Sequence, residues 1–148
     1  MAFIAFKRDS TEIRIQLAQI ERYYERQSVN PTDEKWCAVF LHGGKGYSPV
    51  MLSKAVIDEA MREADLGHLF LDLDPEKNGS TEQYGGKVSF NFGFVTQYQT
   101  HVSGSTRIIQ PSGQTIVHNS VDEIDNMLGL KTTPALIRVT APSGLNHT

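Results

Sequence analysis

The apolar positions of the first thirty residues predict a short strand followed by a helix. The opening AFIAF segment, residues 2–6, is apolar and favours a strand. Asp9 or Ser10 can then cap a helix that ends before residue 30, because the next apolar residues recur at helical steps of four, three and four positions. These apolar residues are Ile13, Leu17, Ile20 and Tyr24.

The next segments predict a second strand and a second helix. Residues 36–41 form an unbroken apolar run, which is typical of a central strand covered on both faces. Ser48 suits the cap of a helix, Pro49 its first position, and Gly67 the residue just past its end. Val50, Val56, Ile57, Ala60, Met61 and Ala64 would share its buried side, and Asp58 and Arg62 on the opposite side would form an i,i+4 pair.

The pattern changes to a period of two after a polar loop at residues 75–86. The apolar run at 68–74 predicts a strand before this loop, and KVSFNFGFV at 87–95 alternates as a half-buried strand does. Its phenylalanines, Phe90, Phe92 and Phe94, are assigned to the core rather than to base stacking, so RNA is not an expected partner. Residues 97–103 either extend this strand or turn back as another.

The remaining sequence predicts a hairpin, a short helix and a last strand. Two β-rich runs flank a Pro-Ser-Gly turn between residues 106 and 119. Ser120 and Glu123 form a capping box for a short helix, with Gly129 just past its end. Residues 135–140 predict the closing strand, and residues 141–148 a loose tail.

Together these elements predict a single compact α+β domain over residues 1–148. The expected sheet is mixed, with a β-α-β-α-β amino-terminal half and a mainly antiparallel carboxyl-terminal half. A strand, helix and strand in succession usually form a right-handed parallel pair, so the runs at 36–41 and 68–73 should be parallel.

Composition narrows the partners and the compartment. The 14 basic and 17 acidic residues are mixed along the chain, with a formal net charge of −3, so no broad basic face is available for DNA. Cys37 is the only cysteine, which excludes an internal disulfide and a multi-cysteine zinc site. The first twelve residues lack a signal-peptide core, and no apolar run approaches the ~20 residues that cross a bilayer. We therefore expect a cytoplasmic protein that needs no cofactor, metal or membrane.

The segment FLHGGKGYSPV carries the candidate binding residues. If the two strands were parallel, their carboxyl ends would bring together His42, the glycine-rich loop and Asp72. Gly43, Gly44 and Gly46 would allow close backbone approach, Lys45 would supply charge, and Ser48 would cap a helix whose amino end attracts anions. The spacing matches neither a phosphate loop nor a dinucleotide motif, so the loop is also compatible with a simple connection.

Two functional hypotheses follow from these residues. The first is a non-enzymatic binding or inhibitory protein, of immunity or phage-accessory type by analogy, which captures a small anionic ligand such as a nucleotide or blocks a protein partner. The alternative is a phosphoesterase or nucleotide-acting hydrolase, in which the 42–48 loop holds phosphate, Asp72 or Asp74 carries a metal or acts as base, and His42 acts as acid. The sequence favours the binding protein because no catalytic pair, metal cluster or cofactor motif appears, and it leaves homo-oligomer formation open.

Overall fold

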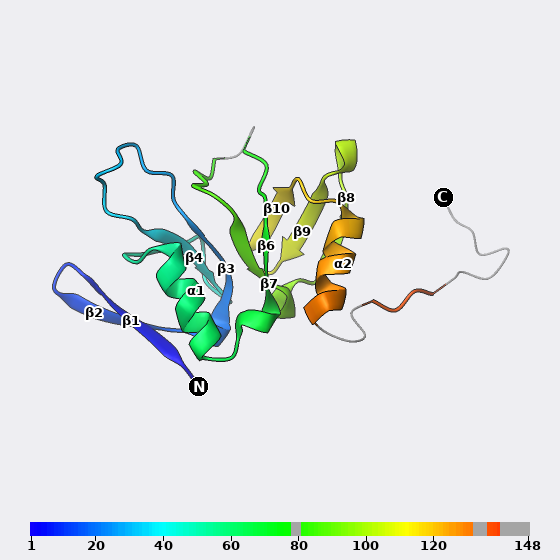
Figure 1. The fold of residues 1–148 in the computed structure, drawn as a ribbon. Helices are drawn as coiled ribbons and strands as arrows, with labels where there is room; N and C mark the ends of the chain where they lie inside the picture. The colour runs from blue at the N-terminus through cyan, green and yellow to red at the C-terminus, as the bar shows by residue number, and fades with distance from the viewer. Residues whose placement is uncertain (78–80, 132–135, 140–148) are drawn as a thin grey trace.

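The computed structural model describes residues 1–77, 81–131 and 136–139, which contain ten strands, two α-helices and four 3₁₀ turns (Figure 1). The strands are β1 (Phe3–Arg8), β2 (Thr11–Gln16), β3 (Ile20–Glu25), β4 (Cys37–Leu41), β5 (Ser48–Val50), β6 (Phe70–Leu73), β7 (Val88–Asn91), β8 (Gln97–Thr100), β9 (Thr106–Gln110) and β10 (Gly113–Val117). The helices are α1 (Lys54–Glu63) and α2 (Val121–Lys131). The 3₁₀ turns span Leu17–Gln19, Gly67–Leu69, Phe92–Phe94 and Val102–Gly104.

The strands form three antiparallel sheets. β1 and β2 form a two-stranded hairpin, the central sheet has the order β5-β4-β3-β7-β6, and the third has the order β10-β9-β8. The end of β6 connects the last two sheets, because the chain after it pairs with β10 through a bridge between Pro75 and Val117. The molecule is thus one compact α+β domain that is mainly β, as the sequence predicted at that level. The finer prediction of a β-α-β-α-β half with a mixed sheet does not match the structure.

The helix predicted after Asp9 is wrong. Asp9 adopts a left-handed φ of 55° in the two-residue turn between β1 and β2, a conformation that aspartate tolerates better than most residues. Ile13 and Ile15 then alternate with polar residues along β2, and the chain continues into β3 through the 3₁₀ turn. Two strands joined by one short turn thus reproduce the helical spacing of the apolar residues.

The second predicted helix exists, but it begins later than predicted. Ser53, not Ser48, is the amino-terminal cap of α1, and its side chain accepts a hydrogen bond from the amide of Val56. Ser48 and Pro49 belong to β5, an edge strand of the central sheet, where proline is tolerated because one side of the strand needs no ladder hydrogen bond. Within α1, Ile57 and Met61 are buried as predicted, whereas Val56 is exposed and Asp58 pairs with Lys54 instead of Arg62.

The strands predicted to be a parallel pair are not neighbours. β3 and β7 lie between β4 and β6, and three successive antiparallel pairings make β4 and β6 run in opposite directions. Their carboxyl ends therefore point in opposite directions along the strands and lie at opposite ends of the sheet. β4 is nevertheless an interior strand with buried residues on both faces, as its unbroken apolar run indicated.

The carboxyl-terminal half follows the predicted antiparallel pattern. β9 and β10 form the predicted hairpin, and β7 is buried on both faces rather than half-buried. The capping box is confirmed, since the amide of Glu123 donates to Ser120 Oγ at 3.1 Å. α2 continues through Gly129 to Lys131. Residues 136–139 form no strand, and the predicted tail lies outside the described residues. Neither α1 nor α2 is long and apolar enough to cross a bilayer, within the part of the chain that is described.

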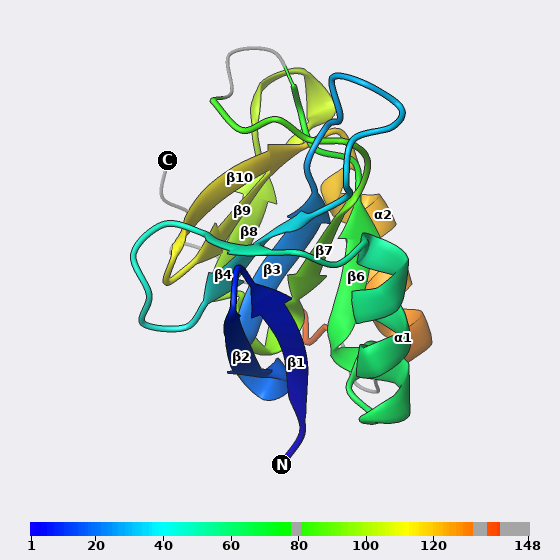
Figure 2. The same cartoon turned by 90° about the vertical axis from the view of Figure 1, so that its left-hand side faces the viewer.

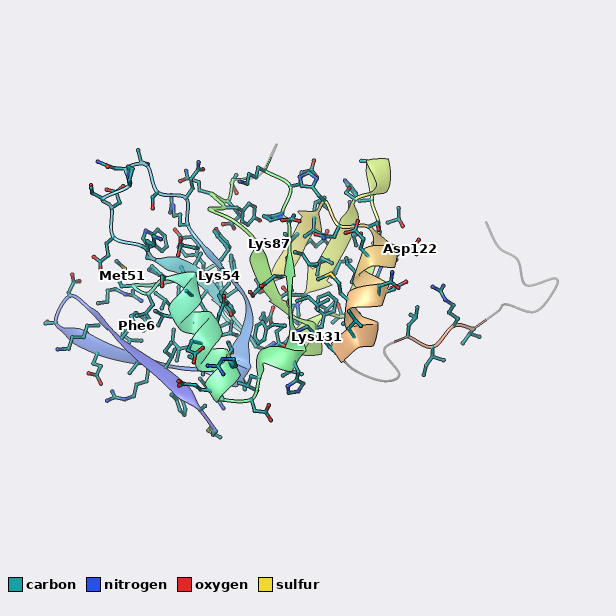
Figure 3. The ribbon with its side chains drawn as sticks, in the orientation of Figure 1. Phe6, Met51, Lys54, Lys87, Asp122 and Lys131 are labelled. Carbon is teal, nitrogen blue, oxygen red and sulfur yellow. The ribbon has the colours of Figure 1, made fainter. Side chains whose placement is uncertain are left out.

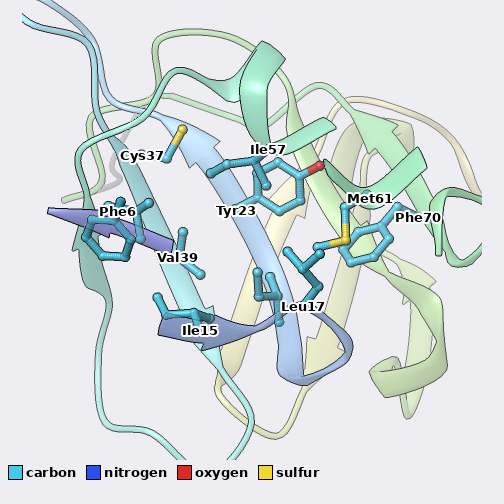
Figure 4. Packing of buried hydrophobic residues seen from close by; sticks show 11 residues of the cluster. Phe6, Ile15, Leu17, Tyr23, Cys37, Val39, Ile57, Met61 and Phe70 are labelled. Atoms are coloured by element: carbon cyan, nitrogen blue, oxygen red, sulfur yellow. The ribbon is translucent and has the colours of Figure 1, made fainter. Parts of the chain in front are cut away.

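The central sheet separates two clusters of buried side chains. α1 and the β1–β2 hairpin cover one side, and the β8–β10 sheet with α2 covers the other (Figures 1 and 2). On the α1 side, Tyr23, Ile57, Met61 and Phe70 pack together, as Figure 4 shows. Cys37 belongs to this cluster and is fully buried, and its burial raises the pKa of the thiol to about 12. The second cluster contains Phe40, Phe90 and Ile108.

Candidate functional site

The glycine-rich loop is the exposed connection between two antiparallel strands. It joins the end of β4 to β5, and Gly44 closes a turn by donating its amide to the carbonyl of Leu41 at 2.9 Å. Gly43 and Gly46 have φ values of 81° and 68°, the left-handed region in which glycine is favoured. The glycines therefore shape a wide hairpin loop.

The loop does not lead into a helix amino terminus. Ser48 lies in β5, where it pairs with Val39 of β4, and the next helix, α1, begins only at Lys54. Lys45 is exposed at the tip of the loop. The helix dipole on which the anion-binding hypothesis partly relied is thus missing at this position.

Asp72 lies apart from the loop. It sits on the α1 side of β6, where Ser89 Oγ donates a hydrogen bond to its carboxylate and Lys54 Nζ lies 3.3 Å from Oδ1. Figure 3 labels Lys54, the first residue of α1. His42, in contrast, contacts Glu21 and Phe94. Glu21 belongs to β3, which is two strands away from the β6 strand that holds Asp72. The structure does not bring His42, Lys45 and Asp72 to a common cavity, although the hydrolase hypothesis requires them to meet.

A β-bulge in β3 organises a different set of residues. Ile20 pairs with Leu41 but Arg22 pairs with Phe40, so Glu21 is the extra residue of the bulge. As a result, Glu21 and Arg22 both contact Ser112 in the turn of the β9–β10 hairpin. Arg22 donates to Ser112 Oγ at 2.6 Å, and the amide of Ser112 donates to Glu21 Oε1 at 2.9 Å. The bulge therefore fastens the third sheet to the central one.

Glu21 links this buried network to the surface. Its side chain is fully buried, and His42 Nδ1 donates to its Oε2 at 2.8 Å. Burial alone would raise the pKa of Glu21, but the hydrogen bonds from Ser112 and His42 outweigh burial and bring the pKa below its ordinary value. The imidazole of His42 is 45% exposed and stacks on Phe94 with ring centroids 4.5 Å apart. His42 is therefore held in one orientation at the beginning of the loop.

Arg22 is a buried cation held by neutral groups. Its guanidinium donates to Gln110 Oε1 at 3.2 Å and lies 3.7 Å above the centre of the Phe40 ring. Gln110 in turn donates to the carbonyl of Glu21 at 2.7 Å. A cation with this burial is stabilised by the ring face and by the two oxygen acceptors.

Aromatic rings continue from Phe40 to the molecular surface. Tyr47, the last residue before β5, packs against Phe40 and Trp36 with centroid distances of 6.2 and 5.9 Å. Arg26 lies 5.1 Å from the centre of the Trp36 ring and donates to the Tyr47 hydroxyl at 3.3 Å. We call these five residues the aromatic–arginine surface: Arg22, Arg26, Trp36, Phe40 and Tyr47. Its exposed end is formed by Tyr47, which is 41% exposed, with half-buried Trp36 and Arg26.

The sequence contained one sign of this arrangement. Within residues 20–24, Glu21 and Arg22 stand between apolar Ile20 and the tyrosines, and in a strand covered on both faces such residues must be buried with polar partners. Their partners, however, lie about ninety positions later in the chain, for example 88 positions for Arg22 and Gln110. No spacing rule relates residues so far apart.

Chemical groups for metal binding do not gather in the described part of the chain. Residues 1–77, 81–131 and 136–139 contain no group of three histidine, cysteine or acidic side chains that could hold a metal ion. No protein-family model, curated protein or solved structure matches this chain. The functional argument therefore depends on the geometry of the residues themselves.

Proposed function

We propose that the chain is a non-enzymatic binding protein that captures or blocks a protein partner through the aromatic–arginine surface and the adjoining 42–47 loop. The observation that carries the proposal is the continuous stack from Arg22 through Phe40 and Tyr47 to Trp36 and Arg26. Tryptophan, tyrosine and arginine are the residue types that dominate binding energy at protein interfaces. Here they are already fixed against one another, so their ordering adds little to the cost of association.

The charges around the surface favour an acidic partner. Within the described residues, the Arg26 side chain donates hydrogen bonds to Gln83 Oε1 and to the Tyr47 hydroxyl, both neutral groups. Lys45 is exposed on the adjoining 42–47 loop, whereas exposed Lys35 is offset by Asp33 and Glu34 beside it. These cations would steer a partner that presents carboxylates around an apolar centre. Gly43 to Gly46, in the connection between β4 and β5, form the rim of the proposed binding surface.

A small anion is the weaker choice of ligand for this loop. An anion site made from backbone amides usually needs several N–H groups directed to one point, as at a helix amino terminus. The 42–47 loop leads into β5 instead, and the first helical turn begins at Lys54. The rings and guanidinium groups beside it offer a broad surface, which suits a macromolecule better.

Affinity purification of the tagged full-length chain from its source cells tests the proposal. The paired substitution Arg26→Ala with Trp36→Ala removes the exposed end of the surface. Arg62→Ala with Phe3→Ala is the matched control, because both residues are exposed and neither belongs to the aromatic–arginine surface. We expect a protein of defined stoichiometry in native mass spectra of the wild type and the control, reduced at least about tenfold in the paired variant.

Two results would count against the proposal. One is retention of the same partner by the Arg26→Ala, Trp36→Ala variant at the wild-type level. The other is a small molecule as the only retained species, which would return the function to ligand capture. Thermal melting of both variants shows that the comparison is between folded proteins.

A further inference from the structure

A separate groove lies between α2 and β8. It encloses a cavity of about 770 Å³, and its walls also include the 3₁₀ turn Phe92–Phe94 and the segment before β6. Its apolar wall residues include Leu69, Leu71, Phe92, Val95 and Leu128. Lys131 also lines the groove, and Figure 3 labels it at the end of α2. None of these residues belongs to the aromatic–arginine surface.

One carboxylate stands among the apolar walls. The side chain of Asp125 is only 13% exposed, and its Oδ1 accepts a hydrogen bond from the Tyr98 hydroxyl at 2.6 Å. Burial and the hydrogen bond to Asp125 raise the pKa of Tyr98 to about 12, so the hydroxyl remains a donor at neutral pH. Oδ2 of Asp125 is directed to the groove, where Arg138 NH2 lies at 3.5 Å.

The chain's own residues 136–139 lie along this groove. Leu136 and Arg138 line the cavity, although Leu136 is 44% exposed and the Arg138 side chain 77%, and Ile137 and Val139 are 76% and 87% exposed. The two lining residues are two positions apart, the spacing at which side chains of an extended chain face the same way. β8, which also lines the groove, is an edge strand of the third sheet and pairs only with β9 within the described residues. An extended chain can use such an edge for backbone hydrogen bonds.

We propose that the groove is a peptide-binding site for an extended segment that carries an arginine two residues after a leucine, and that residues 136–139 occupy part of it in cis. The leucine side chain packs on the apolar walls, and the guanidinium pairs with Asp125. Since 770 Å³ remains open with residues 136–139 in place, the cis segment fills the site incompletely. A partner peptide of the same pattern would compete with it.

The charges of the groove limit how basic the peptide can be. Asp125 is the carboxylate that lines the cavity, whereas His68, Lys131 and Arg138 line it as basic residues. A ligand with several successive cations would meet repulsion from Lys131. The site therefore selects one arginine within an apolar segment rather than a polybasic sequence.

A titration of the full-length chain followed by amide NMR tests this proposal. The probe is the blocked peptide acetyl-Ala-Leu-Ile-Arg-Val-Thr-amide, and the control peptide has glutamate in place of arginine. Arg138→Ala weakens the cis occupant, so the probe should bind at least about fivefold more tightly to this variant than to the wild type. Shifts are expected at residues 92–98 and along α2, and the glutamate peptide should cause none.

Asp125→Asn in the Arg138→Ala background separates recognition from folding. Asparagine keeps an oxygen that can accept the Tyr98 hydrogen bond but loses the charge, so the fold should be preserved and the probe should bind about tenfold more weakly. Equal affinities for the wild type and Arg138→Ala, or equal affinities with and without Asp125, would overturn the proposal. Binding of agmatine as tight as that of the peptide would overturn the peptide assignment, and dimerisation lost in Arg138→Ala would identify a second copy as the occupant instead.

Discussion

The two sides of the central sheet are stabilised in different ways. On the α1 side, the buried cluster consists of aliphatic and aromatic side chains, and the polar atoms of Tyr23 and Lys54 lie at its margin with Asp58. On the side of the β8–β10 sheet, Glu21, Arg22 and Gln110 are buried within hydrogen-bonded reach of one another. The first side depends on apolar area removed from water, and the second also depends on each polar group keeping its partner.

This difference shows on which side of the sheet exposed side chains are held in fixed positions suited to recognition. A fully apolar cluster offers no directional groups, so the surface above it can vary with little consequence for the interior. On the other side, the hydrogen-bonded network begins at buried Gln110 and reaches the exposed His42 and Tyr47 through direct contacts. Exposed side chains there are held by the same contacts that join the two sheets.

The largest loss of stability is expected when a carboxylate is introduced into the apolar cluster on the α1 side of the central sheet. Val39 is 1% exposed within the α1-side cluster, and Val39→Asp would bury a charge with no cation or donor arranged to meet it. We expect the variant to fail to fold, whereas Val39→Ala should fold with reduced stability. Circular dichroism and the yield of folded protein provide the measurement. A Val39→Asp variant with an unchanged melting temperature would show that this side tolerates polar groups as well as the other does.

A smaller, pH-dependent effect is expected for Glu21→Gln. The folded-state pKa of Glu21 lies below the ordinary 4.5, so its carboxylate stabilises the fold above that pH and the contribution is lost as the pH falls through the folded-state value. At pH 7 the substitution should lower the free energy of unfolding by about 1–3 kcal/mol. The difference between wild type and variant should shrink below pH 4.5 in urea denaturation curves. Glu59→Gln, at an exposed ion pair with Arg62, is the control, and an equal pH profile in both variants would contradict the role of Glu21.

Arg26→Ala tests whether the aromatic–arginine surface serves partner binding or the stability of the fold. The half-buried Arg26 packs its guanidinium on Trp36, so its loss should lower the free energy of unfolding by no more than about 1 kcal/mol. If the surface serves recognition, partner affinity should fall by more than stability does. Isothermal calorimetry with the partner and thermal melting of the free protein give the two numbers. A loss of stability without a loss of affinity would make Arg26 a structural residue.

The smallest effect is expected for Lys45→Ala. Lys45 is exposed on the loop, so the substitution should change the free energy of unfolding by less than about 0.5 kcal/mol. Thermal-shift measurements with phosphate and nucleotides then test the loop directly, since a ligand at 100 times its dissociation constant adds about 2.7 kcal/mol. Equal curves for wild type and Lys45→Ala with every anion are expected if the loop binds protein. A shift that the substitution removes would restore the anion site.

Some of the fold was predictable because the signals were local. The β9–β10 hairpin, the capping box of Ser120 and Glu123, and the coverage of β4 on both faces depend on residues close together in sequence. The segment at 11–25 misled because Ile13, Leu17 and Ile20 have helical spacing although they belong to β2, a 3₁₀ turn and β3. The alternation of Ile13 and Ile15 was the competing signal.

The strand order of the central sheet and the positions of the candidate site residues depended on pairing between strands that are distant in sequence. The order β5-β4-β3-β7-β6 separates β4 from β6, and no local pattern reports which strands become neighbours. The prediction that His42 lies close to Asp72 assumed that β4 and β6 are adjacent parallel strands. His42 instead meets Glu21, whose place in a strand was hidden by the predicted helix. Because a helix was wrongly predicted over this segment, Glu21 and Arg22 could not be recognised as the residues that organise the candidate site.

The burial of Cys37 has a practical consequence for experiments on this protein. A thiol reacts with maleimides as its thiolate, and a pKa of about 12 within a closed cluster leaves almost none at neutral pH. Because Cys37 is the only cysteine in the sequence, the natural chain behaves as a cysteine-free background. A single cysteine introduced at Lys45 or Val102 would accept one fluorophore at a known position. Docking at the loop could then be followed by fluorescence without first replacing a core residue.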